Sequence, residues 1–322
     1  MKPHLSITET EEAIKTIKDT FEVRLSASLN LRRISAPLFL DKQSGLNDHL
    51  NGQEKPLTFN HNGNDIEVVQ SLAKWKRHVL YEYGFENGEG LYTDMNAIRP
   101  SENLDHLHSH YVDQWDWEKA IAKESRTRAF LRETVQSIYR VITSVERTLA
   151  SLYPALRETL PDTITFIDAE TLRATYPSLS PEEREHIITQ DKKAVFIERI
   201  GGALKDGKPH DLRSPDYDDW QKNGDLLLWH EQNQEAVEIS SMGIRVDKKA
   251  MQNQLKHFNH WHKGDYHNHI ENNTFPQSIG GGIGQSRLCL LLLQKSHIGE
   301  VQATYWPPSI RQACKKKGIQ LL

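Results

Sequence analysis

A glycine-rich run that leads into an apolar segment is the part of this chain whose residue types most clearly suggest chemistry. Residues 279–284 contain four glycines, Arg287 follows, and residues 288–293 are apolar. An arginine in the first turn of a helix opposes the helix dipole and would be partly desolvated here, so it favours an anion as partner. Because glycines let a bound group approach the backbone and guanidinium binds phosphate oxygens in pairs, the run predicts a nucleotide phosphate site. The alternative is an ordinary turn and a core helix whose Arg287 reaches solvent or pairs with a carboxylate.

The run matches neither of the two common nucleotide-binding motifs. It lacks the Lys-Ser/Thr pair of a P-loop, and its glycines do not have the spacing of a dinucleotide fingerprint. Other polar side chains are therefore needed to identify the ligand that an anion site here would bind.

Polar side chains alternate with tryptophans in a second segment, residues 110–117, which we expect to form a strand. Period-two alternation divides this strand into two faces, with Val112, Gln114 and Asp116 on one and Asp113, Trp115 and Trp117 on the other. An amide and a carboxylate on one face are able to hold a small zwitterion. The alternative is an ordinary sheet with one solvated face.

Two carboxylates on neighbouring expected strands are candidate metal ligands. Glu238 and Ser240 are expected to share a face, and Asp225 heads the next strand. Two hard carboxylates suit Mg²⁺, which accepts few protein ligands when substrate phosphates supply the others. Residues 99–102 and the loop 213–219 add further charges, but each is commonplace when taken alone.

Helical and strand patterns are interleaved along the chain. Helices are expected from the capping pattern of Thr8 and Glu11 to residue 29, after Ser71, over 130–149 and after Ser180. Strands are expected over 34–40, 66–69, 92–98, 110–117, 194–200, 226–229 and 236–246. Because adjacent strands look joined by hairpins, an α+β domain around an antiparallel sheet fits best. We expect one catalytic domain, 1–322, with a loop over 44–65 and a polar insertion at about 248–273.

Composition limits the classes of function. The 44 acidic and 40 basic residues give a formal net charge of −4, which provides no general attraction for nucleic acid. Cys289 and Cys314 are the two cysteines, too few for a disulfide framework or a thiolate metal site. No apolar run is long enough to span a bilayer, and the N-terminus leads into charged sequence. We therefore expect a cytoplasmic protein without a membrane or nucleic-acid partner.

A group of histidines lies inside the polar insertion. Its members are His257, His260, His262, His267 and His269. Their spacing fits no common metal-ligand pattern, so we interpret the segment as a solvated helical insertion.

Six motifs, taken together and in this order, resemble those of ammonia-dependent asparagine synthetase (aspartate-ammonia ligase). They are SLAKWKR (71–77), GEGLYT (88–93), YVDQWDW (111–117), PDYDDW (215–220), SSMGIRVD (240–247) and GGGIGQSR (280–287). The resemblance covers nearly the whole chain, and its specificity comes from the set, since no single motif is specific. It implies a fold similar to the catalytic domain of class II aminoacyl-tRNA synthetases, with an antiparallel β-sheet flanked by helices. It also implies a homodimer that converts L-aspartate, ATP and ammonia to asparagine, AMP and pyrophosphate through a β-aspartyl-adenylate.

The resemblance further implies roles for individual residues. Arg99 would hold the α-phosphate, Arg287 the outer phosphates and Glu102 the adenine or its surroundings, while Asp225 and Glu238 would carry Mg²⁺. The aspartate-binding set would be Asp48, Ser71, Lys76, Gln114, Asp116, Ser241 and Arg245. Further nucleotide-binding positions would be Leu107, Val112, Arg213, Asp218, Gly282 and Gly284. The residues expected to act in catalysis are Asp48, Lys76, Arg99 and Gln114.

Two of these implications concern loops. Asp48 lies on the glycine- and asparagine-rich loop, and it would close over the site, attract ammonium and accept its proton. Pro37 falls where the class II interface motif places its proline, which is the basis for expecting a dimer.

Ammonia rather than glutamine is expected as the nitrogen donor for an independent reason. A glutaminase needs a nucleophilic cysteine. Cys289 lies in an apolar helix and Cys314 in a basic tail, and neither is a credible nucleophile.

Two alternatives remain open from the sequence. One is another class II ligase, related to aspartyl- or asparaginyl-tRNA synthetase, which a tRNA-charging assay would identify. The other is a catalytically silent paralogue, which would be expected to have lost phosphate-binding arginines or metal carboxylates. Arg99, Arg287, Asp225 and Glu238 are all present.

Overall fold

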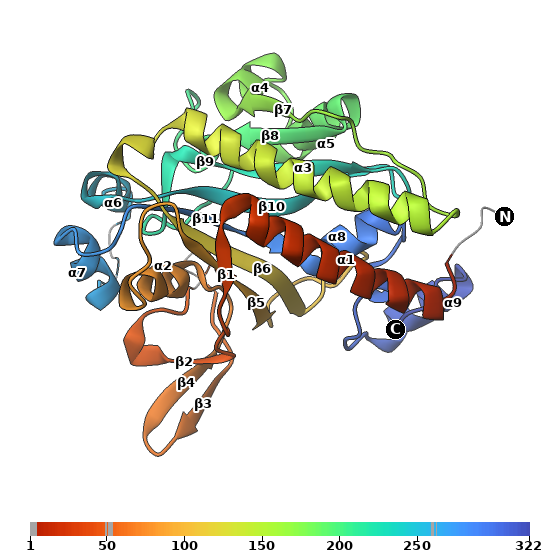
Figure 1. Cartoon of the computed structure of the whole chain (residues 1–322), viewed down its shortest axis with the longest axis horizontal. Helices are drawn as coiled ribbons and strands as arrows, with labels where there is room; N and C mark the ends of the chain where they lie inside the picture. Colours follow the sequence, from red (N-terminus) through yellow and green to blue (C-terminus); the bar gives the residue numbers. More distant parts are fainter. Residues whose placement is uncertain (1–4, 49, 51–53, 259–260, 262) are drawn as a thin grey trace.

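An eight-stranded sheet forms the centre of the molecule in the computed structural model, which describes residues 5–48, 50, 54–258, 261 and 263–322 (Figure 1). Its strands, in spatial order, are β1 (Leu31–Arg33), β5 (Gly90–Ile98), β6 (Tyr111–Ala120), β11 (Ser278–Gly284), β10 (Glu235–Arg245), β9 (Asp218–His230), β8 (Ala194–Glu198) and β7 (Thr165–Asp168). The pairs from β5 to β8 are antiparallel, and only the outer pairs β1·β5 and β7·β8 among the described strands are parallel. The expected α+β class around an antiparallel sheet is confirmed.

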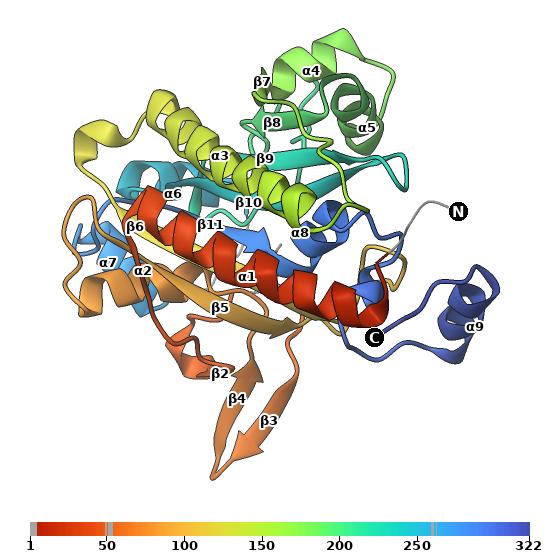
Figure 2. The ribbon, with the colours of Figure 1, turned by 45° about the vertical axis from the view of Figure 1, so that its right-hand side comes forward.

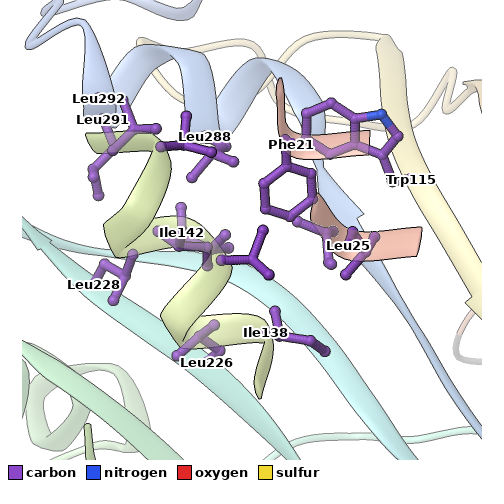
Figure 3. Packing of buried hydrophobic residues seen from close by; sticks show 14 of the residues in the cluster. Phe21, Leu25, Trp115, Ile138, Ile142, Leu226, Leu228, Leu288, Leu291 and Leu292 are labelled. Atoms are coloured by element: carbon purple, nitrogen blue, oxygen red, sulfur yellow. The ribbon is translucent and has the colours of Figure 1, made fainter. Parts of the chain in front are cut away.

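Three helices cover one face of this sheet. They are α1 (Ile7–Leu29), α3 (Arg128–Leu152) and α8 (Gln285–Leu292), and α1 and α3 lie side by side in both views (Figures 1 and 2). Their apolar stripes meet the sheet in one cluster, in which Phe21 stacks on Trp115 with ring centroids 4.4 Å apart (Figure 3). Burial of such stripes is the main source of stability of these helices, because helical propensity alone is weak.

The remaining elements lie around the sheet and its other face. Helices α2 (Ala73–Glu82), α6 (Lys248–Leu255) and α7 (Asp265–Glu271) lie together, α4 (Ala169–Thr175) and α5 (Pro181–Lys192) lie near β7 and β8, and α9 (Pro308–Lys316) is near the C-terminus. A small sheet of β2 (Phe39–Asp41), β4 (Asn64–Val68) and β3 (Thr58–His61) projects from the main body (Figure 2). None of the described helices has both the length and the apolar character needed to cross a membrane.

The predicted elements differ from the structure in the first seventy residues. The strand expected over 34–40 is wrong, because β1 ends at Arg33 and β2 begins at Phe39, and Pro37, which cannot donate to a sheet ladder, lies between them. The loop expected over 44–65 contains a hairpin, β3 and β4, whose Asn62 and Gly63 both have positive φ. An Asn-Gly pair is a strong hairpin signal that the sequence interpretation overlooked.

The first helix begins earlier than expected. Ser6 caps α1, and its side chain accepts a hydrogen bond from the Glu9 backbone N–H while the Glu9 carboxylate accepts one from the Ser6 N–H at 2.8 Å. The capping box assigned to Thr8 and Glu11 is therefore wrong, because the same spacing two residues earlier forms the cap.

The glycine-rich run is a strand rather than a turn. Residues 278–284 form β11, which lies between β6 and β10, and α8 follows directly with Arg287 in its first turn. A Cβ atom at Gly280 or Gly282 would overlap the side chain of Glu118 or Gln114, respectively, on β6. These glycines therefore leave room for polar side chains of the neighbouring strand.

Candidate active site

A cavity of about 330 Å³ opens on the face of the sheet that α1 and α3 leave uncovered, and it gathers most of the predicted site residues. The predicted residues that line it are Ser71, Lys76, Arg99, Glu102, Leu107, Val112, Gln114, Asp116, Arg213, Asp218, Glu238, Ser241, Arg245, Gly282, Gly284 and Arg287. Asp48 and Asp225 are described residues that do not line it. The interpretation of β6 as two-faced is confirmed, because Trp115 and Trp117 are in the core while Gln114 and Asp116 face the cavity.

A row of directly paired residues runs across the sheet at the cavity and ends at Asp225, which does not itself line the cavity. Asp225 of β9 is opposite Ser241 of β10, Ser241 is opposite Gly282 of β11, and Gly282 is opposite Asp116 of β6. Directly opposed residues in antiparallel strands share one face of the sheet. Residues from four strands thus lie on one face of the sheet.

The expectation that Glu238 and Ser240 share a face is wrong. The register between β9 and β10 shifts between these two residues, and one extra residue in a strand reverses the alternation of its side chains. Glu238 and Ser241 line the cavity, while Ser240 is a described residue that does not. Asp225 lies in the middle of β9 rather than at its start, because β9 begins at Asp218.

Lys76 projects from α2 to the floor of the cavity. Its ammonium pairs with the Asp116 carboxylate and donates a hydrogen bond to the Gly281 carbonyl at 2.8 Å. Burial, reinforced by the neighbouring Arg245, lowers the pKa of Lys76 despite the Asp116 carboxylate. One of the three N–H groups of Lys76 therefore remains available to a ligand, as does Asp116 Oδ2, which has no hydrogen-bond partner.

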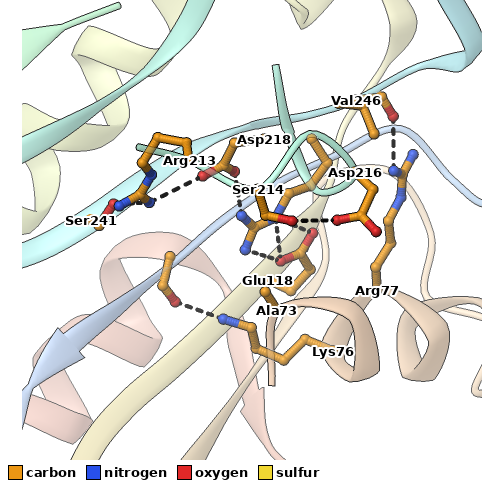
Figure 4. A network of polar contacts seen from close by, with 12 residues as sticks. Ala73, Lys76, Arg77, Glu118, Arg213, Ser214, Asp216, Asp218, Ser241 and Val246 are labelled. Carbon is orange, nitrogen blue, oxygen red and sulfur yellow. Dashed lines mark hydrogen bonds and ion pairs between the residues drawn. The ribbon is translucent and has the colours of Figure 1, made fainter. Parts of the chain in front are cut away.

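Arg245 is held by two carboxylates beside this pair. Its guanidinium donates to Glu118 at 2.7–3.0 Å and also pairs with Asp218; Figure 4 labels these two carboxylates. These two carboxylates raise the pKa of Arg245 although burial opposes this. Arg213 reaches the same place from its loop, where it bonds Ser241 Oγ and lies 3.6 Å from Asp218.

The charges on this side of the cavity balance. Three cations, Lys76, Arg213 and Arg245, face three carboxylates, Asp116, Glu118 and Asp218. Buried charges need such partners, because an unpaired charge is strongly destabilised away from water. A zwitterion suits such a set, because it adds one charge of each sign.

The other side of the cavity carries two arginines. Arg99 and Arg287 both line it; burial is the first cause of the lowered pKa of Arg99, and the charge of Arg287 is the second. Arg99 Nε has no hydrogen-bond partner, and Arg287 donates to the Glu238 carbonyl at 3.0 Å. Two neighbouring guanidinium groups with unused donors favour an anion that carries several charges. Arg287 also lies 3.8 Å from the Glu238 carboxylate, so the alternative in which it pairs with a carboxylate is observed, and the anion site at Arg287 remains a prediction.

Asp225 and Glu238 have properties that suit a divalent cation. Burial and the neighbouring Glu238 raise the pKa of Asp225 well above its ordinary value, and Asp225 Oδ1 has no hydrogen-bond partner. A cation would relieve the repulsion between the two carboxylates and occupy this unpartnered oxygen. Within the described residues no group of three or more His, Cys, Asp or Glu side chains is placed to hold a metal, so bound phosphates would have to complete the coordination.

Asp48 lies behind the cavity instead of lining it. The carboxylate is buried, and Oδ1 lies 4.0 Å from Lys74 Nζ. Lys74 also pairs at 2.7 Å with Asp216, which His267 contacts at 2.9 Å. The closure of the Asp48 loop remains a prediction, and positions 49 and 51–53 of that loop lie outside the described residues.

The histidine-rich segment is more than a solvated insertion. His267 is buried and contacts Asp216, and Met251, Tyr266 and Ile270 form a small core between α6 and α7. His260 and His262 lie outside the described residues. Part of this segment therefore supports the loop that carries Asp216, which periodicity alone did not indicate.

Sequence reasoning missed several polar residues of the site. Glu118 was overlooked because the strand was expected to end at residue 117, whereas β6 continues to Ala120 and Glu118 follows Gln114 and Asp116 at period two. Ser109 and Gln302 also line the cavity, and they hydrogen-bond to each other across 193 positions of sequence. Nothing in the local pattern indicated that contact.

The family model and the relatives that match this sequence carry the same description. A family model described as aspartate-ammonia ligase matches residues 8–318. A protein of Lactobacillus delbrueckii subsp. bulgaricus named aspartate--ammonia ligase is 55% identical, over 99% of this chain and 97% of the relative. A Bacillus mycoides protein with the same name is 53% identical, over 98% of each chain.

Solved structures share the fold at low identity. Asparaginyl-tRNA synthetase of Pyrococcus horikoshii, complexed with asparaginyl-adenylate, matches with a TM-score of 0.66 and 12% identity, over 92% of this chain and 70% of that chain. Aspartyl-tRNA synthetase of Entamoeba histolytica matches with a TM-score of 0.64 and 13% identity, over 93% of this chain and 58% of that chain. At such identity the likeness establishes the class II synthetase fold alone.

Proposed function

The chain belongs to the aspartate-ammonia ligase family and joins L-aspartate to ammonia, and we propose that it does so by first coupling the β-carboxylate of aspartate to AMP. In the first step a carboxylate oxygen would bond to the α-phosphorus of ATP and pyrophosphate would leave. In the second, ammonia would bond to the acyl carbon and AMP would leave, giving L-asparagine. The observation that best supports this is that Arg99 and Arg287 face the same cavity as the balanced charges around Lys76 and Asp116.

Aspartate would lie on the charge-balanced side of the cavity. Its α-ammonium fits Asp116 Oδ2 and Gln114, and its α-carboxylate fits the remaining donors of Lys76 and Arg245. Ser71 and Ser241 line the same cavity and offer hydroxyl groups to either end. With its α-ammonium and α-carboxylate held, the substrate would direct its β-carboxylate toward the arginines. The two reactants would then meet in a fixed orientation within one complex and not by a bimolecular encounter.

ATP would lie on the side that carries Arg99 and Arg287. Arg99 would stabilise the charge that develops on the α-phosphate as the carboxylate attacks, and Arg287 would hold the outer phosphates. Glu102, Leu107 and Val112 line this side and would contact the base. Because Gly282 and Gly284 lack side chains, the nucleotide would be able to approach the backbone of β11.

Asp225 and Glu238 would hold Mg²⁺. Such an ion would offset the charge of the ATP phosphates. The two carboxylates fit this role because Asp225 Oδ1 has no hydrogen-bond partner, and because burial and the neighbouring Glu238 raise the pKa of Asp225 although Arg213 opposes this.

For the second step we propose that Asp48 attracts ammonium and accepts the proton released as nitrogen bonds to the acyl carbon. The carboxylate is already ordered beside Lys74, and the loop that carries it would have to move to bring it to the cavity. Gln114 would position the acyl oxygen through its amide.

We further propose a homodimer that acts in the cytoplasm, where ATP and free aspartate are available. Leu38 and Phe39, next to Pro37, are 46% and 48% exposed, and Leu57 and Phe59 add exposed apolar area nearby. Exposed apolar residues in one place are typical of an interface. Light scattering of the purified chain should give twice the mass of 37.1 kDa; a single-chain mass at micromolar concentration would contradict the dimer.

Ammonium salts should support asparagine formation, and ammonia-free glutamine should not. Burial raises the pKa of Cys289 to about 12 and also raises that of Cys314, so both thiols are poor nucleophiles near neutral pH. The assay measures asparagine, AMP and pyrophosphate with ATP, Mg²⁺, aspartate and each nitrogen source. Comparable turnover with glutamine, or pyrophosphate release without aspartate, would contradict the proposed reaction.

A further inference from the structure

A buried carboxylate on β6 to which the proposed reaction gives no role, Asp113, lines the cavity and connects two elements of its nucleotide side. Asp113 is 6% exposed and belongs to the same strand as Gln114 and Asp116. Its Oδ1 accepts a hydrogen bond from the Ser286 N–H at 3.0 Å, and its Oδ2 accepts one from Ser286 Oγ at 2.8 Å. Both carboxylate oxygens are therefore occupied by one residue of α8.

This contact replaces the cap that α8 lacks. The N-cap residue of α8 is Gly284, which provides no side-chain cap, and the first N–H groups of a helix need acceptors from elsewhere. A carboxylate at this end also complements the helix dipole. Asp113 supplies the acceptor and the negative charge from β6. Lys18 of α1 lies 3.5 Å from the same carboxylate.

A second set of hydrogen bonds strengthens the same junction. Gln302 Nε2 donates to Ser286 Oγ and to the Tyr111 carbonyl, each at 3.1 Å, and Ser109 Oγ donates to Gln302 Oε1 at 2.5 Å. Gln302 is buried. The first turn of α8 is thus tied to the start of β6 by a carboxylate and by an amide.

Arg287 follows Ser286 directly in this fixed turn. Its guanidinium donates to the Glu238 carbonyl at 3.0 Å, so the side chain is held at its tip, and the helix turn holds it at its base. We propose that Asp113 is a positioning residue for ATP, which sets the place of Arg287 relative to Arg99 by capping α8 from β6. This proposal rests on the proposed role of Arg287 in holding phosphate.

Replacing Asp113 by alanine should therefore impair ATP use specifically. A displacement of about 1 Å at a positioning group can cost about a hundredfold, so the KM for ATP should rise about tenfold or more and kcat/KM for ATP should fall up to about a hundredfold. The KM for aspartate should change less than about twofold. Asp113→Asn keeps an acceptor for the Ser286 N–H and should recover most of the loss.

A matched control separates this role from general destabilisation. Glu146 of α3 is also buried, and its carboxylate accepts hydrogen bonds from the Thr159 N–H and Oγ1 at 2.8 and 2.9 Å, away from the cavity. Glu146→Ala should lower the melting temperature without raising the KM for ATP. An equal rise in that KM for Glu146→Ala and Asp113→Ala would overturn the proposal.

A double-mutant cycle identifies the residue through which Asp113 acts. If Asp113 acts by placing Arg287, the Asp113→Ala change should have little further effect on kcat/KM for ATP in an Arg287→Ala background, because coupled residues are not additive. Fully additive losses would overturn the proposal. A native KM for ATP in Arg287→Ala alone would instead reject the phosphate-binding role of Arg287. Where Asp113→Ala fails to fold, Ser286→Ala, which removes one of the two bonds, serves in the same cycle.

Discussion

Replacing Arg99 by alanine should reduce aspartate-dependent pyrophosphate release on the order of a thousandfold. Arg99 is half-buried, lines the cavity and keeps Nε without a partner, so it is available to the charge that develops on the α-phosphate. Loss of one such preorganised donor commonly costs about a hundred- to a thousandfold in rate. Arg99→Lys should recover only part of the activity, because lysine keeps the charge but not the paired geometry of the guanidinium. Quenched-flow measurement of pyrophosphate follows this step without the second one.

Arg184 provides the matched control for this substitution. It is buried, lies on α5 and donates through Nε to the Tyr176 carbonyl at 3.0 Å. Arg184→Ala removes a buried arginine of equal size and should leave pyrophosphate release within a few fold of the native rate. Aspartate binding, measured by calorimetry, should survive in Arg99→Ala. Near-native pyrophosphate release in correctly folded Arg99→Ala would contradict the role of Arg99 in adenylation.

Replacing Asp225 by asparagine should reduce kcat/KM for ATP at least about a hundredfold and raise the Mg²⁺ concentration needed for half-maximal rate. The substitution keeps the shape of the side chain and removes the charge that would bind the cation. In the native protein, burial and Glu238 raise the pKa of Asp225, so Mg²⁺ competes with a proton for this carboxylate. The Mg²⁺ concentration for half-maximal rate should therefore fall as the pH rises, because deprotonation favours the metal. Asp225→Asn should lose most of this pH dependence.

Asp219 tests whether any buried aspartate on β9 has this effect. It lies on the same strand, is buried and pairs with Lys222 at 2.6 Å and Arg126 at 3.4 Å. Asp219→Asn should leave the Mg²⁺ requirement unchanged. If Asp219→Asn and Asp225→Asn shift the Mg²⁺ requirement equally, or if chelation of Mg²⁺ leaves the native rate intact, the assignment of Asp225 as a metal ligand fails.

The periodic parts of the chain were predictable because their pattern is local. The long helix expected over 130–149 is α3, the antiparallel pair of 226–229 and 236–246 is β9 and β10, and the two faces of β6 were correct. Ser180, Pro181 and Glu183 form the expected helix start, with Ser180 and Glu183 as the capping box. In each case the signal lies within one turn of a helix or a few residues of a strand.

The parts that were not predicted depend on contacts between distant residues. The bulge that brings Ser241 rather than Ser240 to the cavity is a property of the pairing between β9 and β10. The glycine run lies as a strand beside β6, where a side chain at Gly280 or Gly282 would overlap that of Glu118 or Gln114. Similarly, the contact of His267 with Asp216 joins residues 51 positions apart. Alternation within one segment carries no information about these neighbours.

The site residues were brought together by the motif resemblance more than by local pattern. Arg99, Arg213 and Arg287 lie on three separate segments, and only the fold places them around one cavity. Asp48 and Asp225 are the exceptions among the described site residues, since neither lines the cavity, and Asp48 lies beside Lys74. A loop that has to move cannot be placed from spacing, because its position depends on the bound substrate.

Transfer of oxygen from aspartate to AMP tests the central claim most directly. Aspartate labelled with ¹⁸O in both oxygens of the β-carboxylate is incubated with ATP, Mg²⁺ and ammonium, and the products are analysed by mass spectrometry. Coupling to AMP predicts one labelled oxygen in AMP, one in asparagine and none in pyrophosphate. Unlabelled AMP, or label that appears in inorganic phosphate together with ADP, would contradict it.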